Sequence, residues 1–140
     1  WFMIITRRLV LESEGHFFSW NITPQARRFV AETGLRNGLL TILYQHTTGA
    51  VVLLEHETGI LADLEDALEK IAPENGLYFH HLRDVDFNGS SHVRNALLGS
   101  SLSIPFAEGD LLLGQYQDIL VLDMQTSDQP RSLILQIMGE

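Results

Sequence analysis

Short apolar segments of strand length, interrupted by three segments of helical character, most constrain the fold of this chain. The strand-like segments are residues 2–11, 17–22, 39–45, 50–54, 102–106, 111–113, 119–124 and 133–138. They are rich in Ile, Leu and Val, and turn-forming Gly, Asp or Pro residues separate several of them. This order predicts an α+β domain in which helices pack on a largely antiparallel sheet, with a mixed sheet as the alternative.

The helical segments are recognised by their boundary residues and by their apolar spacing. Thr23 suits the N-cap of a first helix with Pro24 at its first position, and Gly34 is placed to end that helix. In residues 58–72 the apolar side chains recur at helical spacing and form one stripe. A third, shorter helix is predicted over residues 90–98.

Length and composition predict a single domain spanning residues 1–140. At 140 residues and 45% hydrophobic content, the chain can bury roughly two thirds of its unfolded surface without cross-links. Lys and Arg number 9 against 18 Asp and Glu, and the net charge of -9 argues against general nucleic-acid binding.

The lack of cysteine and the lack of a membrane-spanning segment limit both the location of the protein and the metal ligands available to it. The chain has no cysteine, so any transition-metal site must rely on imidazole. No apolar run reaches the ~18 residues of a membrane span. We therefore expect a soluble, cytoplasmic protein with neither a membrane nor a nucleic-acid partner.

Three histidines are the best candidates for chemistry. His46, His80 and His92 each lie where regular structure gives way to a turn or a helix start. If they converge, they could bind one divalent metal and leave a coordination position open. Zinc is the first choice, and magnesium is possible because Asp84 and Asp86 are separated by one residue. The alternative is that each histidine is an ordinary surface residue and that both carboxylates are solvated.

A carboxylate is the natural companion of these imidazoles. Glu55 follows the strand after the His46 break and could act as general base or fourth ligand. With His46 and His92 it forms the predicted catalytic set. A surface carboxylate preceding a helix is the alternative interpretation of Glu55.

An anion site is predicted at the start of the third helix. Asn88, Gly89, Ser90 and Ser91 could offer backbone N–H groups and hydroxyls to a phosphate, which needs no basic patch. A small phosphorylated metabolite is therefore the expected partner. Gln117 could orient the ligand by hydrogen bonds, or it could satisfy a backbone group at a sheet edge.

These residues belong to a longer set of motifs that occur in order along nearly the whole chain. The set is His46-Thr47-Thr48-Gly49-Ala50 with Glu55, Tyr78-x-His80, Asn88-Gly89-x-Ser91-His92, Leu98-Gly99-x-Ser101-Leu102, Ile104-Pro105, Gly109-x-Leu111, Leu113-Gly114, Gln117 and the closing strand with Arg131. Together the motifs resemble the YjbQ family, also called the secondary thiamine-phosphate synthase family.

The resemblance implies a small α+β fold with antiparallel β-sandwich character and about three helices. It implies a homotrimer with sites near subunit boundaries, and a pocket in which His46, His80 and His92 hold a metal or an anion. The implied activity is that of a transferase, which joins a pyrimidine diphosphate to a thiazole phosphate to give thiamine phosphate. Leu54 and Tyr116 depart from the Asn and Trp usual in the family, which alters the wall of the ligand site.

Three other functions remain open at this point. The first is a metal-assisted hydrolase that uses the same histidines on a phosphate ester. The second is a non-catalytic trimer that sequesters a metal or a phosphorylated metabolite. The third is a purely structural trimer, in which His92 has no role in ligand binding.

Overall fold

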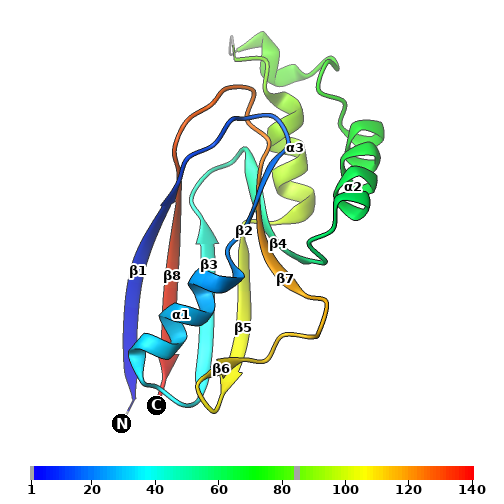
Figure 1. The fold of residues 1–140 in the computed structure, drawn as a ribbon. Coiled ribbons are helices and arrows are strands. Elements are labelled where there is room, and N and C mark those ends of the chain that lie inside the picture. The colour runs from blue at the N-terminus through cyan, green and yellow to red at the C-terminus, as the bar shows by residue number, and fades with distance from the viewer. Residues whose placement is uncertain (1, 84–85) are drawn as a thin grey trace.

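The computed structural model describes residues 2–83 and 86–140 and contains two sheets, three α-helices and one 3₁₀ helix (Figure 1). In chain order the elements are β1 (Met3–Leu11), β2 (Phe18–Asn21), α1 (Thr23–Thr33), β3 (Gly38–Tyr44), β4 (Gly49–Leu54), α2 (Thr58–Ile71), the 3₁₀ helix η1 (Phe79–Leu82), α3 (Gly89–Leu98), β5 (Ser101–Ala107), β6 (Asp110–Leu111), β7 (Asp118–Asp123) and β8 (Arg131–Gly139).

The strands form two antiparallel sheets. The larger sheet has the order β1-β8-β3-β5-β6 and the smaller has the order β2-β7-β4. Every pairing between described strands is antiparallel. The predicted α+β fold with antiparallel sheets is therefore confirmed, and the mixed sheet is not what these residues form.

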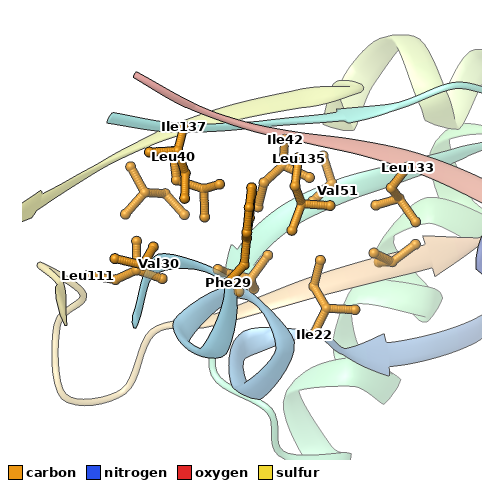
Figure 2. Packing of buried hydrophobic residues seen from close by; sticks show 14 of the residues in the cluster. Ile22, Phe29, Val30, Leu40, Ile42, Val51, Leu111, Leu133, Leu135 and Ile137 are labelled. Carbon is orange, nitrogen blue, oxygen red and sulfur yellow. The ribbon is translucent and has the colours of Figure 1, made fainter. Parts of the chain in front are cut away.

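The main core lies where α1 and the smaller sheet face the larger sheet. Alternation along β3 and β8 sends one set of side chains inward, as the period of a strand requires. Figure 2 shows Phe29 extending from α1 toward these strands, among the buried aliphatic side chains. The labelled members of this cluster are Ile22, Phe29, Val30, Leu40, Ile42, Val51, Leu111, Leu133, Leu135 and Ile137.

The start of α1 differs from its prediction by one position. Thr23 is the first helical residue, and its hydroxyl accepts the N–H of Ile119 at 2.8 Å instead of capping the helix. Asn21 Oδ1 accepts the N–H of Thr23 at 3.0 Å. The hydroxyl thus joins α1 to β7, a contact that depends on tertiary structure. The predicted end is confirmed, because Gly34 adopts the left-handed conformation with φ 72°.

Helix α2 is stabilised at its start by a side chain that the sequence prediction did not name. Glu57 accepts the N–H groups of Gly59 at 2.8 Å and Ile60 at 2.7 Å, and these bonds lower its pKa. The apolar stripe of α2 is only half covered, and Leu68 is its buried member. No helix in the described part of the chain is long and apolar enough to cross a membrane.

Four strand ends meet at one end of the two sheets. Tyr44 at the end of β3 lies opposite Leu133 near the start of β8, and Gly49 at the start of β4 lies opposite Asp123 at the end of β7. Helix α3 lies beside this end in Figure 1, next to β4. Residues that follow or precede these strands are therefore brought together, although they are distant in sequence.

Candidate functional site

A cavity of about 640 Å³ opens at this end of the sheets, and His46, His80 and His92 all line it. His46 follows β3, His80 belongs to η1, and His92 lies in the first turn of α3. The predicted convergence of the three histidines on one pocket therefore agrees with their placement. Asp86 also lines the pocket. Asp84, its predicted companion, lies outside the described residues.

His80 and His92 form a close pair of rings. Their centroids are 4.7 Å apart and the rings meet edge to face. His80 Nε2 lies 3.1 Å from Asn88 Oδ1, while Asn88 Nδ2 donates to Gln125 Oε1 at 3.1 Å. Because the Asn88 amide nitrogen faces Gln125, its oxygen must accept, and His80 Nε2 carries the proton in this bond. Asn88 therefore fixes the orientation of one ring of the pair.

His46 is held differently, by the backbone of β8. Its Nε2 accepts the N–H of Ser132 at 2.8 Å, so the neutral ring carries its proton on Nδ1. Burial lowers the pKa of His46, the charge of Arg131 lowers it further, and Asp123 acts in the opposite direction. His46 is thus a neutral side chain whose Nδ1–H can donate and whose Nε2 lone pair is already used.

This arrangement does not fit a metal bound by all three imidazoles. A ligating nitrogen must offer a lone pair, and the Nε2 lone pair of His46 points at the Ser132 N–H. In residues 2–83 and 86–140, no group of three or more His, Cys, Asp or Glu side chains could hold a metal ion. A three-histidine site would require His46 to leave its backbone partner.

A buried ion pair lies beneath the histidines. Arg131 is 2% exposed and its Nε lies 3.0 Å from Oδ1 of Asp123, which is fully buried. Asp123 also accepts the hydroxyl of Ser13 and, at 3.0 Å, the N–H of Gln125. Arg131 lines the pocket, and within the described residues its Nη2 has no hydrogen-bond partner. The site therefore contains a desolvated cation with donor capacity to spare.

Arg131 was named in the sequence only as part of the closing strand motif. The signal that could have identified it is its position, at the start of a strand whose inward side chains are otherwise apolar. A charged residue is almost never fully buried without a partner, so Arg131 in that pattern points to an internal carboxylate. Which carboxylate it meets depends on the β7 and β8 ends lying together, which the sequence does not reveal.

Tyr44 contributes a second buried polar atom to the pocket wall. Its hydroxyl has no hydrogen-bond partner in the part of the chain that the structure describes. Burial raises the pKa of Tyr44, and the charge of Asp123 raises it further. Gly49 lies against this ring, and a Cβ there would collide with the Tyr44 side chain and with the carbonyl of Leu122. The glycine therefore leaves the space that the tyrosine occupies.

Two predicted site residues lie elsewhere in this chain. Glu55 follows β4 and Gln117 precedes β7, beyond the pair Leu54 and Asp118 at the far end of the smaller sheet. That end is about 17 Å from the pocket end for a strand of this length. Gln117 Oε1 accepts the N–H of Gly114 at 2.8 Å, a backbone group between β6 and β7 rather than at a sheet edge. Within one subunit, neither side chain lines the histidine pocket.

The departures from the family pattern fall at the same far end. Leu54 ends β4 and Tyr116 precedes Gln117, so both are remote from the three histidines within the subunit. Neither residue forms part of the wall of this pocket. Their side chains are therefore not what distinguishes the histidine pocket of this chain.

The predicted phosphate cradle at the start of α3 is largely satisfied internally. The N–H of Gly89 donates to His81 Nε2 at 3.0 Å, and the N–H of Ser91 donates to the Asn88 carbonyl at 3.0 Å. The Ser91 hydroxyl donates to the Met124 carbonyl, and Ser90 is buried. Of the four anion-binding residues predicted at the start of α3, only Asn88 lines the pocket. The predicted cradle is therefore not open to a ligand as expected, because these small residues pack α3 against the sheet.

Comparisons with known proteins agree on one group of relatives. A family model described as UPF0047 protein YjbQ-like matches residues 7–140. A UPF0047 protein of Methanothermobacter thermautotrophicus is 31% identical over 96% of this chain and 90% of its own. One from Archaeoglobus fulgidus is 38% identical over 80% of this chain and 82% of its own.

Solved structures show the same fold. A crystal structure of a YbjQ-like protein of unknown function from Sulfolobus solfataricus P2 has a TM-score of 0.92 at 25% identity, and 99% of each chain is covered. A hypothetical protein from Aeropyrum pernix K1 has a TM-score of 0.89 at 29% identity, with 97% of this chain and 99% of that chain covered. The two sheets and three helices described above are thus shared with these proteins.

Proposed function

Because this chain belongs to the UPF0047 YjbQ-like family, we propose that its histidine pocket binds the phosphate group of a small metabolite. The observation that carries the proposal is the buried Arg131, which lines the pocket and whose Nη2 has no hydrogen-bond partner among the described residues. A phosphate oxygen is the acceptor that a guanidinium binds best, and desolvation strengthens the attraction. The positive charge of Arg131 lies at the pocket, so it can attract a phosphate there although the net charge of the chain is -9.

The histidines add donors and proton carriers to this pocket. His46 offers its Nδ1–H, and His80 is oriented by Asn88 beside His92. An imidazole can both donate and accept a proton, so this pair suits general acid–base chemistry next to a bound phosphate. The predicted catalytic role of His46 becomes one of hydrogen bonding, and the catalytic role predicted for His92 becomes one of proton transfer.

The specific reaction implied by the resemblance is thiamine phosphate synthesis. In it the thiazole nitrogen forms a bond to the methylene carbon of the pyrimidine diphosphate, and pyrophosphate departs from that carbon. The guanidinium of Arg131 and the donors of the histidines are groups that would stabilise the departing anion. Hydrolysis of a phosphate ester is the rival within the same pocket, and non-catalytic binding is the alternative to both.

We expect the protein to bind inorganic phosphate, and His92→Ala to weaken that binding without unfolding the chain. Loss of one hydrogen bond to a charged group corresponds to roughly a tenfold change in affinity. Calorimetric titration with phosphate measures it, with His56→Ala as the matched control, because His56 lies at the far end of β4. Equal affinity of wild type and His92→Ala would contradict the role of His92, and no binding by wild type would contradict the proposal.

Turnover separates the candidate functions. The pyrimidine diphosphate and thiazole phosphate are supplied together, and a panel of phosphate esters is supplied separately. Thiamine phosphate as product supports the transferase, and released inorganic phosphate supports the hydrolase. Tight binding with no product in either assay supports the sequestering protein.

The divalent metal remains a second proposal, favoured by the close pair of His80 and His92. As the side chains lie, this pair could hold a metal but His46 could not, since Ser132 engages its Nε2. We therefore expect His46→Ala to leave the zinc content of purified protein unchanged, and His92→Ala to remove any zinc present. Elemental analysis measures both. Equal loss of zinc in the two variants would support the three-histidine site and contradict this assignment.

The homotrimer that the resemblance implies stays a prediction, and so does the cytoplasmic location expected from the lack of cysteine. Large apolar side chains that face solvent in the single chain favour burial in an assembly, and Leu77, Phe79 and Leu82 are the most exposed of them. In such an assembly, Glu55 and Gln117 would act near a pocket only if that pocket belonged to a neighbouring subunit.

A further inference from the structure

We propose that Gln45 is a further anion-binding residue, and that Arg8 on the outer face of the larger sheet fixes the Gln45 amide so that its NH₂ group faces the histidine pocket. The inference rests on the proposed phosphate pocket and extends it by one donor. Gln45 follows β3, immediately before His46, and it lines the pocket. Arg8 belongs to β1, at the edge of the larger sheet.

Three hydrogen bonds join Arg8, Gln45 and Ser132. Arg8 Nη1 donates to Gln45 Oε1 at 2.8 Å and to Ser132 Oγ at 2.6 Å. The Ser132 hydroxyl in turn donates to Gln45 Oε1 at 2.9 Å. The Gln45 oxygen thus accepts two bonds at once, and each partner also contacts the other.

This triangle determines which way the amide points. A guanidinium has donors and no acceptor, so the group of Gln45 that meets Arg8 must be the oxygen. A flipped amide would set its NH₂ against the guanidinium and lose the bond from Arg8. The Gln45 nitrogen is therefore directed away from Arg8, and its two N–H groups remain for the pocket that Gln45 lines.

Ser132 connects these hydrogen bonds to His46. Its backbone N–H donates to His46 Nε2 at 2.8 Å, and its carbonyl accepts the backbone N–H of Gln45 at 3.1 Å. One residue of β8 thus fixes two neighbouring side chains, leaving His46 with a donor at Nδ1 and Gln45 with donors at Nε2. Donors without lone pairs match an anion with several oxygens and do not match a cation.

The neighbouring arginine provides a built-in comparison. Arg7 lies one position along β1, where a strand turns its side chain to the opposite face. It pairs with Glu32 at 2.5 Å, and its guanidinium lies 4.7 Å from the centre of the Phe29 ring. Removing Arg7 and removing Arg8 change the net charge equally, but only Arg8 contacts Gln45.

The test measures affinity for inorganic phosphate and thermal stability in four variants. Gln45→Glu keeps the shape, gains an ion pair with Arg8 and replaces donors by a negative charge, so we expect affinity to fall by about tenfold or more with stability unchanged or raised. Arg8→Ala frees the amide and is expected to weaken binding several-fold. Arg8→Lys, which still donates, is expected to restore most of that loss. Arg7→Ala is the charge-matched control, with affinity expected near that of wild type.

The outcomes separate this inference from the proposed function. If wild type binds no phosphate, the phosphate pocket itself fails. If wild type binds phosphate and Gln45→Glu binds it equally well, the pocket stands and the role of Gln45 is overturned. If Arg7→Ala weakens binding as much as Arg8→Ala does, the effect is one of overall charge and the positioning role of Arg8 is overturned.

Discussion

We expect Arg131→Met to lower the free energy of unfolding by about 3–5 kcal/mol, the range for breaking a buried ion pair from one side. The fully buried Asp123 would then keep its charge with the Ser13 hydroxyl and the Gln125 N–H as its hydrogen-bond donors among the described residues. Methionine fills similar volume, so the loss reports on charge more than on packing. Equilibrium denaturation by urea, followed by circular dichroism, measures the change.

A double variant is the control for this explanation. Asp123→Asn removes the stranded charge and keeps an acceptor for Ser13 or Gln125. The variant carrying both Arg131→Met and Asp123→Asn should therefore be clearly more stable than the sum of the two single effects predicts. Strict additivity would contradict the view that the two side chains stabilise the fold as a pair.

The second large effect is expected in the core, where we predict that Phe29→Ala destabilises the protein by about 3–5 kcal/mol. Phe29 is 3% exposed and extends from α1 into the cluster shown in Figure 2. Its removal leaves a cavity that β3 and β8 cannot fill, because paired strands are held in register. The same denaturation experiment measures it.

Two further variants calibrate the prediction for Phe29. Phe29→Leu leaves a smaller cavity and should cost less than Phe29→Ala. Phe79→Ala removes the same ring from a side chain that is 91% exposed in η1, and should change the stability of the single chain by less than about 0.5 kcal/mol. A comparable loss from Phe29→Ala and Phe79→Ala would show that Phe29 does not hold α1 against the sheet.

Most of the fold could be predicted because its local signals agree with its tertiary structure. Gly34 ends α1 in the conformation that glycine favours, and every segment predicted as a strand overlaps an observed strand. The start of α1 could not be placed, because the Thr23 hydroxyl is used by Ile119 on another strand. Only the resemblance implied two sheets, since alternation gives the inward face of a strand and not its neighbours.

The site was only partly predictable for a similar reason. His46, His80 and His92 were found because histidines at element ends are unusual, and strand ends at one edge bring them together. Glu55 was predicted beside His46 because the two residues are close in sequence. β4 lies between them, and its length separates them in space. The proposed roles of Arg131 and Gln45 depend on partners from other strands, Asp123 and Arg8 respectively. A local sequence pattern does not predict such partners.

The position of β8 decides when this protein can fold during its synthesis. β8 lies between β1 and β3, so the first strand of the larger sheet has no partner until residues 131–139 leave the ribosome. Contacts that close so long a loop make folding slow and leave apolar strand edges uncovered in the nascent chain. The same strand begins with Arg131 and Ser132, so the pocket is complete only after β8 has paired with its neighbours.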